Sequence, residues 1–319
     1  MKGLSHLYIR QAVATQTEKY NRKEITGYMN WLKKHFVTLI IVLVFMAGLG
    51  LLIYPSFANW WNSFHQAKVI MDYADTVAEL DQEDYDRILN SAKKYNKKLA
   101  KTGILWTMNK DQKAEYKRQL RVEKTGVMGY ISIPKIHIKL PIYHGVAEKV
   151  LQTSIGHIEG SSLPVGGKSS HCIVSGHRGL PSAKLFSDID RLKEGDVWTM
   201  TILNETVTYE VDKIWIVEPN DLSKLSIEKG KDYCTLVTCT PYGVNTHRLL
   251  VRGHRIPNLN GSADVIADAM QIEPVYIAPF VAAPILLILI LMLLFRTLKG
   301  KDKTKKKKRK IKTAKDKKH

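Results

Sequence analysis

Residues 235–255 have the sequence TLVTCTPYGVNTHRLLVRGHR, and the fold and chemistry of the whole chain are best approached from this stretch. Its first residues are apolar or β-branched and predict a strand that ends at Cys239. A turn-rich loop follows, and a second strand is predicted to start at Arg248. A thiol beside a cation at the end of a strand is a candidate nucleophile, because the thiolate is the reactive form.

Strand patterns dominate the chain from Gly129 onwards. Short runs of alternating or β-branched residues are separated by Gly and Pro, and two of them flank Asn204-Glu205, which predicts a hairpin. Many short strands with few helical patterns among them favour a mainly β fold with a closed or nearly closed barrel. The predicted strands are Tyr130 to Ile133, Cys172 to Ser175, Val197 to Ile202, Thr206 to Val211, Ile214 to Val217 (a short buried run), Tyr233 to Cys239 and Arg248 to Arg252.

Helical periodicity marks the region before these strands. Apolar stripes in residues 62–100 predict two helices with a break near Asp81, and these stripes must cover something, which we expect to be the following domain. Residues 101–125 are mostly polar and basic, apart from the apolar triplet Ile104-Leu105-Trp106. Such a triplet is a candidate plug for a nearby hydrophobic groove, or simply the end of a helix.

The net charge of +19 lies almost entirely at the two ends of the chain. Lys and Arg outnumber Asp and Glu by 7 to 2 in residues 1–35 and by 14 to 2 in residues 296–319, whereas the remainder has 28 against 26. A nearly neutral middle argues against a nucleic-acid-binding domain.

Two uncharged runs lie next to these basic ends, Phe36 to Tyr54 and Val275 to Phe295. Each has about 20 residues, enough to cross a bilayer as a helix. Because basic flanks stay cytoplasmic, both termini are expected inside and residues 60–274 outside. Two alternatives stay open: a signal peptide cleaved near Ser56-Phe57-Ala58, and a wall-sorting signal at the second run, although no Leu-Pro-x-Thr-Gly precedes it.

The chain has three cysteines, so at least one thiol is free in a domain that faces an oxidising exterior. Cys234 and Cys239 are five residues apart on one predicted strand, so their side chains point to opposite faces. Parity therefore places Cys172 and Cys234 in the core or away from the site. No Cys-x-x-Cys pair is present, and we expect neither a metal site nor a cofactor.

Two further residues complete a candidate site around Cys239. His177 lies between glycines in Ser175-Gly-His-Arg-Gly179, where a general acid and base could approach the thiol; the alternative is a solvated turn histidine. Arg248 could stabilise a developing oxyanion, with Arg252 as a competitor. Arg255 is a second competitor, and a plain surface charge is the alternative for all three.

Taken together, these segments resemble the sortase family. The motifs are Thr238-Cys-Thr-Pro-Tyr242, Asn245-Thr-His-Arg-Leu249 and Ser175-Gly-His-Arg178, and the resemblance runs from about Gly129 to Arg255. Gly156-His-Ile-Glu-Gly160, Leu163-Pro-Val-Gly-Gly167 and the second predicted membrane anchor make the chain most similar to the pilus-assembling class C sortases of Gram-positive bacteria.

The resemblance implies a closed eight-stranded barrel with Cys239 as nucleophile, His177 as acid and base, and Arg248 as transition-state stabiliser. It implies a membrane-bound transpeptidase that cleaves Leu-Pro-x-Thr-Gly-like motifs between Thr and Gly and joins pilin subunits through a lysine amine. Class C members also carry a lid with an Asp-Pro-aromatic motif before the barrel. Residues 100–128 contain no Asp-Pro, and Trp106 is the aromatic candidate for a lid.

The expected organisation has seven parts: a cytoplasmic segment (1–35), a transmembrane helix (36–56), a helical extension with a possible lid (57–128), the catalytic barrel (129–258), a linker (259–274), a second transmembrane helix (275–295) and a basic cytoplasmic tail (296–319). Two other functions remain open. One is a housekeeping sortase that attaches proteins to the cell wall, and the other is a membrane-tethered scaffold in which the thiol is buried and inert.

Overall fold

The computed structural model describes residues 2–122, 126–258, 287, 288 and 292. The strands of this part of the chain are β1 (Val127–Ile133), β2 (Ile138–His144), β3 (Ile155–His157), β4 (Ser170–Gly176), β5 (Val197–Ile202), β6 (Glu205–Val217), β7 (Asp232–Thr240) and β8 (His247–Ile256). Its helices are α1 (Lys2–Ala78), α2 (Gln82–Thr102), α3 (Lys110–Arg118) and α4 (Glu148–Leu151), with short 3-10 helices η1 (Pro134–Ile136) and η2 (Ile189–Arg191).

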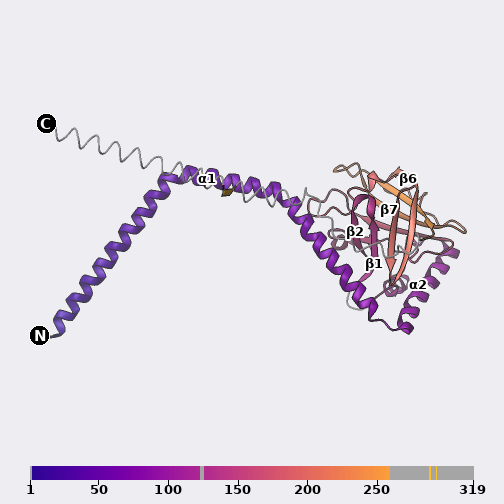
Figure 1. Cartoon of the computed structure of the whole chain (residues 1–319), viewed down its shortest axis with the longest axis horizontal. Helices are drawn as coiled ribbons and strands as arrows, with labels where there is room; N and C mark the ends of the chain where they lie inside the picture. Colours follow the sequence, from indigo (N-terminus) through magenta and orange to yellow (C-terminus); the bar gives the residue numbers. More distant parts are fainter. Residues whose placement is uncertain (1, 123–125, 259–286, 289–291, 293–319) are drawn as a thin grey trace. The chain divides into compact units, whose positions relative to one another are not determined.

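The strands form one closed barrel in the order β1-β2-β3-β4-β7-β8-β6-β5, with β5 returning to pair with β1. The pairs β2–β3 and β4–β7 are parallel, and the other neighbours are antiparallel. Figure 1 shows these strands wrapped around one axis, with α2 beside them. The closed eight-stranded barrel is therefore confirmed, as is the β5–β6 hairpin at Asn204.

The barrel interior is filled by one cluster of apolar side chains, because alternate residues of each strand point inwards. Trp198 and Tyr209 stack there with their ring centroids 6.0 Å apart. Cys172 on β4 and Cys234 on β7 are paired in register and belong to this cluster. The prediction that strand parity puts both cysteines away from the site is confirmed.

One predicted strand is wrong in its burial. Ile214 to Val217 are the last residues of β6 rather than a separate buried strand, and Ile214 and Ile216 are 36% and 65% exposed. The reason lies in the pairing: β5 accompanies β6 only as far as Glu210. Beyond that residue β6 pairs with β8 alone, so its end is open to solvent.

The predicted helix break near Asp81 is confirmed. α1 ends at Ala78, and Asp81 caps α2 by accepting a hydrogen bond from the Asp84 N–H at 2.7 Å. The helix before the break is much longer than residues 62–78, since it is continuous from Lys2. The extension contains residues 36–56, for which the uncharged composition predicts a helix, although a run that is apolar all round shows no helical periodicity.

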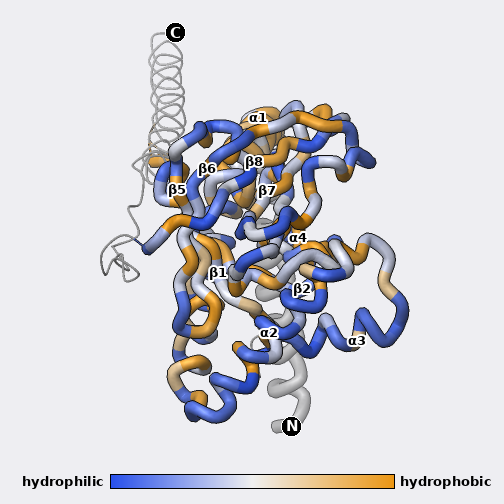
Figure 2. The backbone as a smooth tube through the Cα atoms, turned by 90° about the vertical axis from the view of Figure 1, so that its right-hand side faces the viewer, coloured by the Kyte–Doolittle hydropathy of each residue, from blue (hydrophilic) through white to orange (hydrophobic). Residues whose placement is uncertain are grey.

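The helices cover the barrel as expected, through buried polar side chains as well as apolar ones. The hydroxyl of Tyr73 on α1 accepts a hydrogen bond from the Leu203 N–H at 2.8 Å. Asn96 on α2 accepts from the Leu163 N–H at 2.7 Å and donates to its carbonyl at 3.0 Å. α3 is hydrophilic along most of its length (Figure 2) and buries Tyr116.

One helix among the described residues is long and apolar enough to cross a membrane, the part of α1 from His35 to Ala78. It contains the first uncharged run. The second predicted span (275–295), the linker and the basic tail lie almost entirely outside the described residues, so the presence of two membrane helices is not confirmed. The chain divides into two compact units, Met1–Ile53 and Tyr54–His319, and the barrel and its covering helices belong to the second.

Candidate active site

Cys239 lies one residue before the end of β7 and faces outwards from the barrel. Cys234 and Leu236 point into the core, so alternation directs Val237 and Cys239 to the outer face. Cys239 is partly exposed, whereas the other two cysteines are buried. Burial raises the pKa of the Cys172 thiol, which keeps it protonated and unreactive. Cys239 is therefore the accessible thiol.

Arg248 is the direct partner of Cys239 in the antiparallel ladder of β7 and β8. Directly opposed residues project to the same face, so the guanidinium and the thiol lie on the same side of the sheet. The Arg248 Nη1 atom donates to the carbonyls of His247 at 3.0 Å and Asn245 at 3.3 Å. Both bonds come from one nitrogen of the guanidinium. No acidic partner of Arg248 occurs among the ion pairs of the described residues, so its charge stays available for a substrate oxygen.

Neither competing arginine is placed as Arg248 is. Arg252 makes a bidentate ion pair with Asp212, at 3.0 and 2.8 Å, and lies 4.0 Å from the centre of the Tyr233 ring. Its pKa is raised by these acidic contacts despite partial burial. Arg255 lies at the far end of β8, opposite Tyr209. Strand parity could not separate Arg248 from Arg252, but the ion pair to Asp212 does.

His177 follows β4 directly and is brought to the same end of the barrel as Cys239. The parallel ladder pairs Ser175 with Val237, and His177 and Cys239 are each two residues further along. The Thr238 hydroxyl donates to the Gly176 carbonyl at 2.8 Å and joins the two strand ends. Strands β4, β7 and β8 are adjacent, so the three candidate residues come from three neighbouring strand ends.

The glycine before His177 is required by packing. A Cβ at Gly176 would lie 2.8 Å from the Phe186 ring and 2.8 Å from a methyl group of Ile155. The Phe186 N–H donates to the His177 carbonyl at 3.1 Å, which returns the following loop to the histidine. The close approach that a flanking glycine allows is thus between the backbone at Gly176 and the core side chains Ile155 and Phe186. This packing fixes the backbone that carries the imidazole.

Glu148 on α4 is a neighbour of His177 that sequence reasoning did not identify. Its Oε1 atom lies 3.5 Å from His177 Nε2. A hydrogen bond from Gln152, followed by the nearby His177, lowers the pKa of the Glu148 carboxyl. The carboxylate faces solvent, so water screens its contact with the imidazole. No local pattern in the sequence marks it, because the contact joins segments 29 residues apart.

An apolar cluster on the outer face of the barrel adjoins the site. Val237 lies two residues before Cys239 on β7, and Leu250 lies two residues after Arg248 on β8. The other buried members of the cluster are Ile173, Val217 and Leu225. Ile104, in the connection between α2 and α3, packs against this cluster. Trp106, the sequence-based lid candidate, is 43% exposed and is not part of it.

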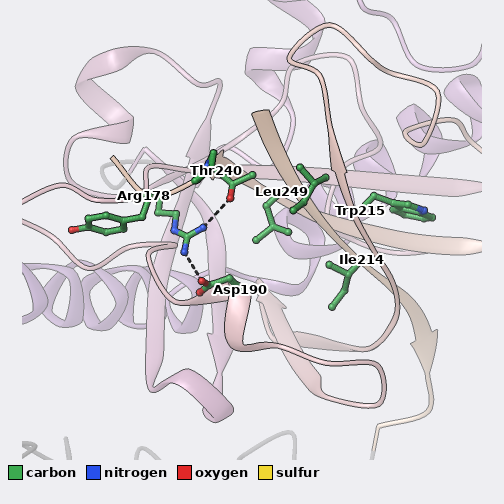
Figure 3. A pocket seen from close by; sticks show the side chains of 9 residues that line it. Arg178, Asp190, Ile214, Trp215, Thr240 and Leu249 are labelled. Atoms are coloured by element: carbon green, nitrogen blue, oxygen red, sulfur yellow. Dashed lines mark hydrogen bonds and ion pairs between the residues drawn. The ribbon is translucent and has the colours of Figure 1, made fainter. Parts of the chain in front are cut away.

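A pocket of about 690 Å³ lies next to the segments that carry the candidate residues and is lined by Arg178, Asp190, Ile214, Trp215, Ile216, Thr240, Pro241, Tyr242 and Leu249 (Figure 3). The Arg178 side chain is only 9% exposed; it pairs with Asp190 and donates to the Thr240 hydroxyl at 3.3 Å. Arg178 follows His177 and Thr240 follows Cys239, so this bond ties the two segments together. The arginine stood in the quoted Ser-Gly-His-Arg motif, but nothing there indicated its partner.

No group of three His, Cys, Asp or Glu side chains that could hold a metal ion occurs in the described part of the chain. The groups that the site brings together are a thiol, an imidazole and a guanidinium. A thiol nucleophile with a proton donor and an oxyanion ligand is suited to acyl transfer through a thioester.

Known proteins share the sequence and fold of this part of the chain. Residues 131–256 match the family described as Sortase domain. The crystal structure of sortase C1 from Streptococcus agalactiae is 65% identical, with a TM-score of 0.59, and the match covers 60% of this chain and all of that one. Sortase C of Streptococcus pneumoniae, whose crystal structure bears on catalysis and pilin substrate specificity, is 41% identical over 60% of this chain and 97% of that one, with a TM-score of 0.55.

A third similar structure is that of Clostridium perfringens sortase C with the C-terminal cell wall sorting motif. It is 40% identical, with a TM-score of 0.52, over 60% of this chain and all of that one. Since identity of 65% extends over the whole length of a solved sortase whose barrel this chain reproduces, the chain belongs to the sortase family of transpeptidases, with class C sortases among its structural neighbours.

Proposed function

We propose that this chain is a membrane-anchored cysteine transpeptidase that polymerises pilin subunits. The observation that carries the proposal is that Cys239 on β7 lies directly opposite Arg248 on β8. His177 follows the neighbouring strand β4, two residues after Ser175, the last residue of β4 that pairs with β7. The sortase C relatives support the pilus role, and the Clostridium perfringens structure, solved with a C-terminal cell wall sorting motif, supports a Leu-Pro-x-Thr-Gly-like substrate.

In the first half-reaction the Cys239 thiolate attacks the carbonyl carbon of the substrate Thr. The oxygen becomes negative in the tetrahedral intermediate, and Arg248 donates hydrogen bonds to it. Protonated His177 gives its proton to the nitrogen of the departing Gly as the peptide bond breaks. The products are a thioester on Cys239 and a peptide with a new amino terminus.

In the second half-reaction a pilin lysine attacks the thioester. Neutral His177 takes a proton from the incoming amine, Arg248 again stabilises the oxyanion, and the Cys239 thiolate leaves as the isopeptide bond forms. Proton and charge are thereby returned to their starting state. No cofactor enters this scheme.

We further propose that Ile104 acts as a lid over the apolar cluster beside the site. A substrate with Leu and Pro needs an apolar surface close to Cys239, and the cluster that contains Val237 and Leu250 offers one. Ile104 packs on it from the α2–α3 connection. Trp106, in the same triplet, would extend the lid towards solvent, so the segment covers the site without an Asp-Pro-aromatic motif.

Sortases are membrane-associated, and we propose the two-pass arrangement with both termini in the cytoplasm and the barrel outside. The proposed parts are a cytoplasmic segment (1–35), a first span (36–56), an extension with the lid (57–128), the barrel (129–258), a linker (259–274), a second span (275–295) and a cytoplasmic tail (296–319). The apolar part of α1 supports the first span. The basic ends support the orientation.

The experiment that tests this function compares the full chain in phospholipid vesicles with its Cys239→Ala and Cys172→Ala variants. Pilin subunits that carry a sorting motif are added, and ladders of joined subunits are scored. Ladders are expected with the native chain and with Cys172→Ala and are expected to be absent with Cys239→Ala. Ladder formation by Cys239→Ala would exclude the proposed nucleophile.

Two other functions are separated by the same preparation. A housekeeping sortase would transfer the acyl group to a lipid-II-like amine in preference to a pilin lysine, so the two acceptors are supplied in competition. A scaffold with an inert thiol would react slowly with a small alkylating agent, and labelling would not impair its function. We expect fast alkylation of Cys239 and loss of activity with it.

A further inference from the structure

A patch of aromatic side chains lies on α1 at the start of the second compact unit, Tyr54–His319, which contains the barrel and is called the catalytic unit below. The aromatic patch consists of Phe57, Trp60, Trp61 and Phe64, which are 43%, 38%, 50% and 52% exposed. The rings form one continuous group: Phe57 stacks with Trp61 at 6.3 Å, and Trp60 stacks with Phe64 at 6.5 Å. Four large exposed aromatic rings on two turns of helix form a surface that favours an apolar or amphipathic partner.

The position of the patch identifies that partner as a lipid–water interface. The patch begins three residues after Tyr54, the end of the uncharged run, and no Asp, Glu, Lys or Arg occurs anywhere from residue 36 to residue 67. Trp and other amphipathic rings concentrate at the headgroup level of bilayers, because one part of the ring is apolar and the indole N–H stays hydrated. The patch therefore stands where the membrane surface is expected.

Polar side chains on the same part of α1 form hydrogen bonds with the rest of the catalytic unit. The Asn59 side-chain oxygen accepts a hydrogen bond from the Lys184 N–H at 2.7 Å. The Asn62 side-chain amide donates to the Ser182 carbonyl at 2.7 Å. Four residues further on, Gln66 reaches the Thr153 carbonyl beyond α4 at 2.6 Å. Side-chain amides interleaved with the aromatic rings thus hold this part of α1 against the barrel.

The segment held by the two asparagines is the loop that leaves His177. This loop runs from Arg178 to Asp188, and it returns to the histidine through the Phe186 N–H. A surface that fixes the aromatic patch therefore also fixes the loop next to the imidazole. The start of β7, by contrast, is at the opposite end of the barrel from Cys239.

We propose that the aromatic patch binds the headgroup region of a phospholipid bilayer and holds the His177 loop at the membrane surface. The catalytic unit is then docked on the bilayer rather than free to swing from its anchor. The site would open beside the membrane plane, where substrates that are themselves membrane-held arrive by lateral diffusion. The proposal rests on the proposed function in one respect, that α1 crosses a membrane.

Tryptophan quenching tests the first half of the proposal. The full chain, in a Trp31→Phe background, is reconstituted in phosphatidylcholine–phosphatidylglycerol vesicles that contain lipids brominated close to the headgroup. We expect strong quenching, lost for the most part in Trp60→Leu with Trp61→Leu and retained in Trp106→Phe, a matched loss of an exposed indole. Quenching that is unchanged by removal of Trp60 and Trp61 would overturn the assignment.

Docking is tested with a fluorescent label on an introduced cysteine, in a Cys239→Ala background in which the other two thiols are buried. We expect brominated lipid to quench a label at Ser182→Cys and not at Lys229→Cys, close to the start of β7. Asn59→Ala with Asn62→Ala should abolish the difference between the two positions while quenching of Trp60 and Trp61 persists. If labels at positions 182 and 229 were quenched equally in the protein that retains Asn59 and Asn62, the proposed docking would be wrong.

A second copy of the chain is the other candidate partner for the patch. It would protect Trp60 and Trp61 from brominated lipid and would give a cross-linked dimer through cysteines placed at position 61, and that result also overturns the proposal. None of these measurements uses catalysis. A chain that docks as described and yet fails to join pilins would refute the proposed function alone.

Discussion

Cys239 and Arg248 are direct partners in the antiparallel ladder of β7 and β8, and both project from the outer face of the barrel. Register, rather than loop conformation, sets their proximity. A strand pair is among the more rigid ways to hold two side chains together, since several backbone hydrogen bonds would have to break before the pair could separate. The nucleophile and its oxyanion ligand are thus positioned by the scaffold itself.

Arg248→Lys is expected to lower kcat by about 100-fold or more with little change in KM, because loss of one oxyanion donor costs about that much and a lysine cannot offer a planar fork. Steady-state cleavage of a Leu-Pro-x-Thr-Gly peptide measures it. Arg252→Lys is the matched control on the same strand and face. It should retain kcat but reduce stability, since the bidentate pair with Asp212 is lost. Equal activity losses in both variants would contradict the assigned role.

Replacement of both core cysteines, Cys172→Ala with Cys234→Ala, should leave the catalytic rate within about twofold. Their side chains lie inside the barrel, away from Cys239. Each truncation removes buried volume, so the free energy of unfolding should fall by about 1 kcal/mol per site. Denaturant unfolding and peptide cleavage test the two halves separately. A folded double variant without turnover would show that one of these thiols takes part in the reaction.

Ile104→Ala should increase access to Cys239. A partly buried aliphatic side chain contributes on the order of 1.5 kcal/mol to its contact, which corresponds to about a tenfold shift between closed and open forms. The rate of Cys239 alkylation by a bulky maleimide is the measurement. Trp106→Ala is the control, because Trp106 is 43% exposed and lies outside the apolar cluster. If Trp106→Ala accelerates labelling and Ile104→Ala does not, the lid residue is the tryptophan.

Arg178→Gln should reduce kcat without abolishing it. The buried guanidinium joins the segments after His177 and Cys239 through Asp190 and Thr240, but it touches neither reacting atom. We expect a loss of roughly 10-fold, since small displacements of positioned groups cost about this much or more. Alkylation of Cys239 at saturating pH should stay normal, which separates altered positioning from unfolding. A full loss of thiol reactivity would argue against this role.

Stability should fall as pH drops from about 6.5 towards 4. Burial lowers the pKa of His157 to about 4, and the pKa of His171 falls to about 4 for the same reason. A histidine whose folded pKa is depressed stabilises the fold above its unfolded pKa of about 6.5, and that stability disappears as protons bind the unfolded chain first. Each site should then lose on the order of 1 kcal/mol per pH unit.

The melting temperature from pH 7.5 to 4.5 measures this effect. His157→Gln should flatten the dependence, because glutamine cannot be protonated and can still reach Tyr116 or the Ser162 carbonyl, the present partners of the imidazole. His137→Gln, at an exposed position, should leave the slope unchanged. A slope that is the same in all three proteins would assign the acid sensitivity to other groups.

Local sequence alone determined many features of this protein. Period-two runs and turn residues determined most strands and the hairpin at Asn204, and the motif around Cys239 determined the nucleophile candidate. Parity alone placed Cys172 and Cys234 away from it. These inferences succeed because side-chain direction in a strand is fixed by backbone geometry and needs no knowledge of distant partners.

Tertiary structure decided the rest, for the opposite reason. The choice of Arg248 over Arg252 depends on Asp212, which is 40 residues away. The link between Arg178 and Thr240 joins positions 62 apart, and the contacts of Ile104 and Asn59 with the barrel are equally non-local. Contacts between distant segments arise only when the chain closes into the barrel, so residue patterns define which groups are available, and closure of the barrel determines which of them meet.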